Sequence, residues 1–158
     1  MQKITPCLWF DKNAEEAVDF YLTVFKNSKK GAVSHYGKEG VEIHGMPEGT
    51  VLTIEFELEG QKFLAMNGGP AFKFSEAISF MVSCDTQEEI DYYWEKLSAV
   101  PESEQCGWLK DKFGLSWQVT PKNMDNYMKG PNSEKVMAVL LEMKKLVIAD
   151  LQKAAEGK

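Results

Sequence analysis

The chain repeats one structural pattern, and this repeat constrains its fold more than any other feature. The segment Asn13-Ala14-Glu15-Glu16 matches Thr86-Gln87-Glu88-Glu89, which lies 73 residues later. In each copy a capping residue is followed three positions on by glutamate, the capping-box signature of a helix start. Apolar residues at helical spacing predict helices over 13–25 and 86–97, each after a short strand. Since neither copy has enough apolar residues for its own core, we expect two supersecondary units that share one sheet system.

The strands that follow each helix alternate between apolar and polar residues. The segment 51–58 does so cleanly, a turn at 59–61 leads into a strand over 62–67, and a second hairpin is predicted over 105–109 and 113–120. The apolar faces carry Leu52, Ile54, Phe56, Leu58, Ile78, Phe80, Val82, Leu115, Trp117 and Val119. The polar faces carry Thr53, Glu55, Glu57, Ser79, Ser83, Ser116, Gln118 and Thr120, with Met81 among them. This pattern predicts sheets with one face under helices and one open face.

Glycine and proline mark the boundaries between these parts. A glycine-dense region over 31–49 predicts one strand near 32–36 and a long loop. We expect a single domain over 1–158, with a first module at 1–67, a linker at 68–76 and a second module at 77–120. A helical extension follows at 121–158, with one or two turns over 121–128 before Gly130-Pro131.

A long helix from Ser133 to about Leu151 is the last predicted element. Its apolar stripe consists of Val136, Leu140, Met143, Val147 and Leu151, widened by Met137, Val139, Leu141, Leu146 and Ile148. A helix that is apolar over so much of its circumference needs burial on more than one side. The alternative is that it folds back over its own domain, and we favour a homodimer with this helix at or near the interface.

Composition narrows the function classes. The chain has 18 basic residues, all of them lysine, against 24 acidic ones, for a net charge of −6. This balance argues against nucleic acid as a partner. No run of 18 apolar residues and no signal peptide stand out, so we expect no membrane partner. Three widely spaced cysteines, Cys7, Cys84 and Cys106, fit a reduced cytoplasmic protein better than a disulfide framework.

Four segments resemble the PhnB-like branch of the vicinal oxygen chelate superfamily, which includes glyoxalase I and the bleomycin-resistance proteins. They are Phe10 to Ala17 with Phe20-Tyr21, Ala77 to Phe80, Cys84 to Glu89, and Gly107 to Gly114. That branch is also called demethylubiquinone-9 3-methyltransferase-like. The resemblance covers about 4–151 and implies an α+β fold of two βαβββ modules, the glyoxalase/bleomycin resistance/dioxygenase fold, plus C-terminal helices. In that fold each sheet curls around a concave cavity, and the resemblance also implies a dimer.

The resemblance also indicates the positions at which a metal ion would be bound. Metal enzymes of the superfamily place His and Glu ligands on the first and last strands of each module, which correspond here to Pro6, Ala65, Ser79 and Gln118. The first two positions can shift by a residue or two. None of the four is a histidine or a carboxylate, and one amide with one hydroxyl is too few for a tight site. We therefore expect no metal and no other cofactor.

If the open face is concave, as the resemblance implies, it forms a pocket. Its expected ligand-binding residues are Thr53, Glu55, Asn67, Ser79 and Gln118. Glu55 is the one carboxylate placed near the middle, and partial burial would raise its pKa and make it a candidate general base. The alternative is a solvated glutamate. Phe72 and Phe74 form either a lid over the cavity or a filling between the modules, with the second slightly favoured.

Other candidates have simpler interpretations. His35 and His44 flank Glu42 in the glycine-rich segment, and we interpret them as exposed loop histidines rather than metal ligands. Cys7 lies in an apolar strand and is expected to be buried, and Cys84 precedes Asp85, which disfavours a thiolate. Cys106 is the best nucleophile candidate of the three, although all fit the role of small buried hydrophobes better.

Two hypotheses about function remain open. The first is a metal-independent enzyme that acts on a small organic molecule, by acid–base chemistry at Glu55 or by methyl transfer as the family label suggests. No glycine-rich turn joins a strand to a helix, so we expect weak or no binding of S-adenosylmethionine. The second is a non-catalytic protein that sequesters its ligand, as resistance proteins do. The sequence does not identify the ligand.

Overall fold

The computed structural model describes residues 1–158, and the chain divides into two compact units, 1–73 and 74–158. The boundary falls inside the expected linker at 68–76.

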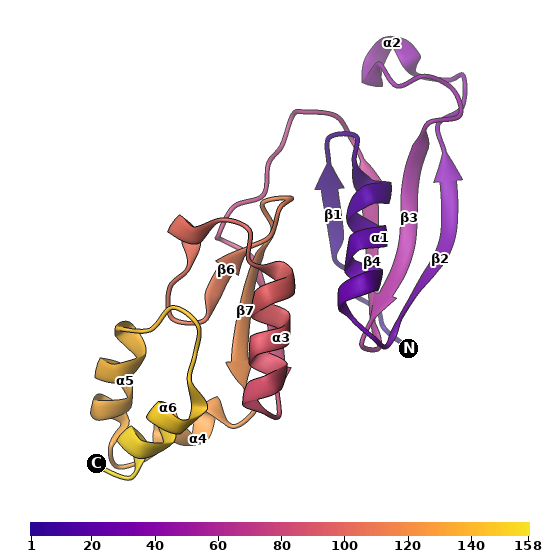
Figure 1. The fold of residues 1–158 in the computed structure, drawn as a ribbon. Coiled ribbons are helices and arrows are strands. Elements are labelled where there is room, and N and C mark those ends of the chain that lie inside the picture. The colour runs from indigo at the N-terminus through magenta and orange to yellow at the C-terminus, as the bar shows by residue number, and fades with distance from the viewer. The chain divides into compact units, whose positions relative to one another are not determined.

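The first unit is a four-stranded sheet with one helix across it. Strand β1 (Cys7–Phe10) leads into α1 (Ala14–Val24), and β2 (Ser28–His35), the short helix α2 (Val41–His44), β3 (Val51–Leu58) and β4 (Gln61–Asn67) follow. The strand order is β1-β4-β3-β2, with β1 parallel to β4 and the other neighbours antiparallel. Helix α1 covers one face of this sheet (Figure 1). The expected βαβββ order is therefore present in this unit.

The core of the first unit lies between α1 and the sheet. The helix buries Ala14, Ala17, Val18, Tyr21 and Val24. The sheet face beneath it buries Leu8, Phe10, Ile54, Phe56, Leu58, Phe63 and Ala65. The Tyr21 ring stacks on Phe56, which stacks in turn on Phe63 with a centroid distance of 5.2 Å. The opposite face of the sheet has no helix on it and is called here the first open face.

The second unit repeats this arrangement with one strand fewer. Strand β5 (Ser79–Cys84) leads into α3 (Gln87–Leu97), and β6 (Trp108–Lys110) and β7 (Ser116–Pro121) follow. The order is β5-β7-β6, with β5 parallel to β7 as β1 is to β4. In place of a counterpart to β2 the chain forms a 3₁₀ turn, η1 (Pro101–Ser103). The residue pattern predicts these three strands, whereas the resemblance implies four.

The prediction of one long C-terminal helix over 133–151 is wrong, because the chain forms two helices there. After α4 (Met124–Lys129) come α5 (Ser133–Leu141) and α6 (Ile148–Ala155). Between α5 and α6 the carbonyls of Met143 and Lys144 accept hydrogen bonds from the N–H groups of Cys106 and Gly107, both at 2.8 Å. The Gln87 side chain binds the same segment twice, donating to the Leu146 carbonyl and accepting from the Ile148 N–H. These long-range bonds replace those that a continuous helix would make.

Most residues of the broad apolar stripe in the C-terminal segment are buried or packed within their own unit. Val136, Leu146 and Leu151 are fully buried in a cluster with Tyr127 and Ala154. Leu140, Met143 and Val139 pack against that cluster. Folding back over its own unit, the alternative to an interface helix, therefore accounts for most of the stripe. Two large apolar residues of α5 stay exposed, Met137 and Leu141.

The sequence predicts the same kind of side-chain cap at the start of α1 and of α3, and the structure shows it only in α3. Thr86 caps α3 as expected, since its hydroxyl accepts the Glu89 N–H. The predicted capping by Asn13 is wrong, because its side chain makes no such bond. Instead the Asn67 side chain, from the far end of β4, accepts the Ala14 N–H at 2.9 Å.

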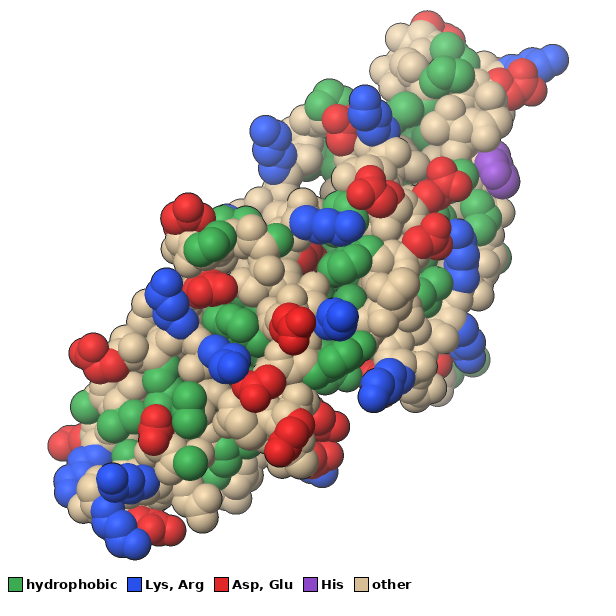
Figure 2. Space-filling model, viewed as in Figure 1, with side chains coloured by type: hydrophobic (Ala, Val, Ile, Leu, Met, Phe, Trp, Pro, Cys, Tyr) green, Lys and Arg blue, Asp and Glu red, His purple; other side chains and the backbone are tan.

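Lysine and acidic side chains are interspersed over the face of the molecule in Figure 2, with no large region of one sign. None of the helices is long and apolar enough to cross a membrane.

Candidate functional site

The first open face is assembled from alternate residues of four strands. The register places Cys7, Leu64 and Glu55 in one row across β1, β4 and β3, with Gly31 of β2 beside Glu55. Below it, Lys62, Glu57 and Lys29 form a second row. Above it, Trp9, Met66, Thr53 and Ser34 form a third. The β1–β4 half of the face is mainly apolar, and the β3–β2 half is polar.

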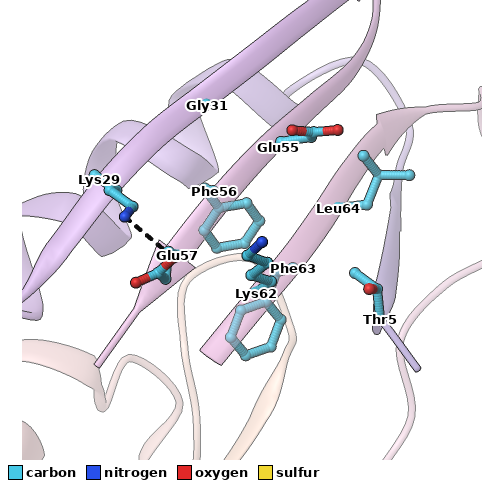
Figure 3. Close-up of a pocket in the computed structure, with 9 residues that line it drawn as sticks. All are labelled: Thr5, Lys29, Gly31, Glu55, Phe56, Glu57, Lys62, Phe63 and Leu64. Carbon is cyan, nitrogen blue, oxygen red and sulfur yellow. Dashed lines mark ion pairs between the residues drawn. The ribbon is translucent and has the colours of Figure 1, made fainter. Parts of the chain in front are cut away.

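A pocket of about 480 Å³ lies on this face. It is lined by Thr5, Lys29, Gly31, Glu55, Phe56, Glu57, Lys62, Phe63 and Leu64. Figure 3 shows Glu55, Lys62 and Leu64 on neighbouring strands, with Lys29 reaching toward Glu57. Pockets of a few hundred cubic ångströms are of the size that holds small organic ligands.

Glu55 lines the pocket, and its side chain has no partner in the chain. It makes no hydrogen bond and no ion pair, whereas its neighbour Glu57 is paired with Lys29 at 3.4 Å. Gly31 lies beside it, and a Cβ there would crowd the Glu55 Cβ at 3.0 Å. The glycine thus leaves the space next to Glu55 open. The carboxylate is free to accept hydrogen bonds from a ligand.

Glu55 is exposed in the structure. The expected role as a general base rested on partial burial of this side chain, which the structure does not show. Glu55 therefore suits the role of a charged hydrogen-bond acceptor, the solvated alternative that the sequence also allowed.

The other predicted ligand-binding residues fall in different places. Thr53 lies on the first open face, where its hydroxyl hydrogen-bonds to Ser34. Asn67 does not join it, because its side chain is 2% exposed and points to the α1 side of the sheet. Ser79 and Gln118 lie on the open face of the second sheet, and the Gln118 amide donates to the Ser79 hydroxyl at 2.9 Å. Asn67 is therefore not a residue of the open face, and that Thr53, Glu55, Ser79 and Gln118 line one cavity stays a prediction.

Sequence reasoning missed the lysines and the glycine of this face. Lys29 and Gly31 belong to β2, which begins at Ser28, four residues before the strand predicted there. Lys62 is the second residue of β4, opposite Glu57. The two consecutive lysines at 29 and 30 are the signal that was available, since they point to opposite faces of β2. Lys29 pairs with Glu57 on the open face, and Lys30 pairs with Asp19 on α1.

The four positions at which the superfamily places metal ligands do not fit a metal ion. Pro6 has no donor, and Ala65 is fully buried on the helix side. Ser79 and Gln118 are bonded to each other. No three side chains of His, Cys, Asp or Glu come together in an arrangement that could hold a metal. The donor set supplies one hydroxyl and one amide, which transition metals bind poorly.

The cysteines and histidines also differ from expectation. Cys84 is buried, and burial together with Glu89 and Asp85 raises the pKa of its thiol to about 12. Cys7 is exposed, so the expectation that it is buried is wrong: β1 alternates, and residue 7 faces the open side. His44 is not a free loop histidine, because its ring packs on Tyr36 and its Nδ1 accepts the Met46 N–H.

Phe72 lies in the first unit and packs edge-on against Trp9, with ring centroids 4.9 Å apart. It is 65% exposed. The Trp9 indole N–H donates to the Gly69 carbonyl, which holds the ring at the end of the first open face.

Residues 2–120 match the family model described as 3-demethylubiquinone-9 3-methyltransferase, which is more than half of the chain. This chain belongs to that family. The family is the PhnB-like branch of the vicinal oxygen chelate superfamily, as the four sequence segments indicated. The extension from 121 to 158 lies outside the match.

Solved structures of similar proteins agree with this family assignment. The PhnB protein from Bacillus cereus is 39% identical, with 76% of this chain and 99% of that chain covered and a TM-score of 0.62. A protein from Pseudomonas aeruginosa is 18% identical, with 77% and 98% covered and a TM-score of 0.57. The fosfomycin resistance protein FosX from Listeria monocytogenes, complexed with Mn(II) and sulfate, is 16% identical, with 82% and 98% covered and a TM-score of 0.51. The fold is that of the glyoxalase/bleomycin resistance proteins. No curated protein matches the chain.

Proposed function

We propose that this protein binds a small organic molecule on its first open face, without a metal ion, and that Glu55 anchors the ligand. The observation that carries this proposal is a carboxylate without a partner that lines a pocket of about 480 Å³. An ionised carboxylate accepts hydrogen bonds only, so the matching ligand group is a hydroxyl, an N–H or an ammonium. Leu64 beside it offers an apolar contact for the rest of the molecule.

Of the two hypotheses from the sequence, ligand binding without turnover has the better support. An exposed glutamate lacks the desolvation that usually prepares a carboxylate for proton abstraction. For methyl transfer, the connections from β1 to α1 and from β5 to α3 contain no glycine that would cradle a nucleotide-type cofactor. The family name alone supports methyl transfer, and this fold carries several chemistries.

The test begins with native mass spectrometry of the freshly purified full chain. We expect a bound species of defined mass and no stoichiometric transition metal in elemental analysis after dialysis. In Glu55→Gln, which keeps the side-chain shape, the bound fraction should fall about tenfold, as loss of a charge-assisted hydrogen bond predicts. Glu15→Gln, on the exposed side of α1, is the matched control and should bind as the wild type does.

Equal retention in Glu55→Gln and Glu15→Gln would refute the proposal. If nothing co-purifies, a ligand-observed NMR screen of small alcohols, amines and aromatic amides replaces the first step. A screen without any hit that depends on Glu55 refutes it equally. Incubating the protein with the identified molecule separates the two hypotheses, because an enzyme converts it and a sequestering protein returns it unchanged.

We also infer a homodimer. Both sheets end in edge strands, which proteins usually pair or cover, and α5 exposes Met137 and Leu141 one turn apart. Sedimentation should show one species near twice the chain mass of 17.9 kDa. Leu141→Asp should shift it toward the monomer, while Lys153→Asp on α6 should not. A monomeric wild type contradicts the inference.

A further inference from the structure

One hydroxyl in the second unit is buried without a hydrogen-bond partner. It belongs to Ser116, the first residue of β7, which is 1% exposed. Leaving a hydroxyl unpaired in the interior costs free energy, and nearly all buried polar groups in folded proteins have a partner. An orphaned group of this kind indicates a partner that is not part of the chain.

The register shows what surrounds this hydroxyl. Ser116 pairs with Ser79 on β5 and with Lys110 on β6, so the three side chains lie in one row on the same face of the sheet. Gln118, two residues along β7, extends its amide to Ser79 on that face. Because neighbouring strands lie only a few ångströms apart, the row brings two hydroxyls and one ammonium close together. Most of the polar groups in this row are hydrogen-bond donors, so the ligand group that fits it best is a negatively charged oxygen atom.

A carboxylate of the chain itself already lies at this row. The Lys110 ammonium forms an ion pair with Glu76, three residues before β5. Because β7 lies between β5 and β6, this pair links the segment before β5 to the strand on the other side of β7, next to the row that contains Ser116. The Glu76 side chain is 61% exposed, and Lys110 lowers the pKa of its carboxyl, so it is ionised at neutral pH.

We propose that the row Ser79–Ser116–Lys110 binds an anionic oxygen group of a small ligand, a carboxylate or a phosphoryl group, and that Glu76 occupies the ammonium until the ligand displaces it. The incoming group pairs with Lys110 and accepts a hydrogen bond from Ser116, which satisfies the buried hydroxyl. Ser116 is 1% exposed, so binding requires a local movement of the chain, in which Lys110 exchanges Glu76 for the ligand. This row belongs to the second unit and Glu55 to the first, and the two proposals are tested by different variants, so either can fail without the other.

The test is a ¹⁵N–¹H NMR titration of the full chain with sodium phosphate and, separately, with sodium acetate, both at constant ionic strength in sodium chloride. We expect saturable shifts at the amides of residues 79, 110, 116 and 118. Which probe binds more tightly distinguishes a phosphoryl from a carboxylate ligand. Glu76→Gln removes the internal competitor and should tighten binding about two- to fivefold, as the modest strength of an exposed ion pair predicts.

Two further variants test the row itself. Lys110→Met should weaken binding about tenfold or more, and Ser116→Ala about three- to tenfold, as loss of a charged and of a neutral hydrogen bond predict. The matched controls come from another exposed pair of the same unit, Lys122 with Asp85 at 3.2 Å. Asp85→Asn and Lys122→Met should leave the titration unchanged.

Shifts that do not saturate, or that persist in Lys110→Met, would overturn the proposal. So would a Ser116→Ala protein that is more stable than the wild type and binds both probes as the wild type does. That result would identify the orphaned hydroxyl as a packing defect or the partner of a buried water molecule.

Discussion

Replacing Asn67 with alanine should destabilise the first unit more than any change at the residue that the sequence marks as the helix cap. The Asn67 side chain accepts the Ala14 N–H at 2.9 Å and donates to the Val51 carbonyl at 3.0 Å. It is 2% exposed, so water does not replace either bond in the folded state. This one side chain therefore ties the start of α1 to the beginning of β3.

The magnitude follows from the groups left without partners. Asn67→Ala leaves one N–H and one carbonyl unpaired in the interior, and each such group costs about 1–3 kcal/mol. Partial relaxation reduces the sum, and we expect a loss of about 2–4 kcal/mol in the free energy of unfolding of this unit. Asn13→Ala removes no capping bond and should cost less than about 0.5 kcal/mol. Thr86→Ala, which removes a real cap in the other unit, should cost about 1 kcal/mol.

The assay has to report on one unit at a time, because two compact units can unfold in separate steps. Urea unfolding followed by far-UV circular dichroism gives the overall change. Hydrogen exchange of the peptide 14–24, measured by mass spectrometry, gives the change at α1 itself. A cost of Asn13→Ala equal to that of Asn67→Ala, or an Asn67→Ala cost below about 1 kcal/mol, would refute the reasoning.

Three further predictions concern single side chains. Iodoacetamide at pH 8 should label the exposed Cys7 first and Cys84 only after unfolding, because Cys84 is buried and its pKa is raised to about 12; equal rates in the folded protein would contradict this. Asp111 is fully buried and accepts hydrogen bonds from two backbone N–H groups of its turn and a tryptophan indole. Asp111→Ala should thus lower the unfolding free energy by about 3 kcal/mol or more in urea, and a loss under about 1 kcal/mol would argue against this. Lys110 lowers the pKa of Glu76, so this pair stabilises the fold above the carboxyl's unfolded pKa, and that contribution is lost as pH falls through the lower folded value. Lys110→Met should raise the Glu76 pKa in a ¹³C NMR titration, and an unchanged value would show that the ion pair does not form in solution.

Local patterns predicted the elements that local forces determine. The alternation over 51–58 gave β3 with its observed bounds and placed Ile54, Phe56 and Leu58 on the buried face. Thr86 caps α3 because its partner, the Glu89 N–H, is three residues away in the same turn. In both cases the deciding contacts lie within a few residues of each other or follow from side-chain period alone.

Predictions failed where the deciding contacts are distant in sequence. The C-terminal apolar stripe has helical spacing throughout, yet hydrogen bonds from Gln87, Cys106 and Gly107 hold the segment between α5 and α6 out of a helix. Cys7 was expected inside because its strand is apolar. Alternation in β1 sends residue 7 to the open face, and only the pairing with Leu64 of β4 reveals which residues share that face.

The two helix starts explain why one motif, present twice, does two different things. Equivalent backbone bonds join Gly68 N–H to the Phe10 carbonyl and Lys122 N–H to the Cys84 carbonyl, so Asn67 and Pro121 occupy corresponding positions beside the first strand of each unit. Proline offers no side-chain hydrogen bond, so α3 depends on its local threonine cap. Three residues separate β1 from α1, whereas two separate β5 from α3. The longer connection accompanies a different way of satisfying the first N–H of α1, with the amide of Asn67 reaching across from β4. The repeat in the sequence therefore identifies where both helices begin, and only the neighbouring strand determines what satisfies each of them.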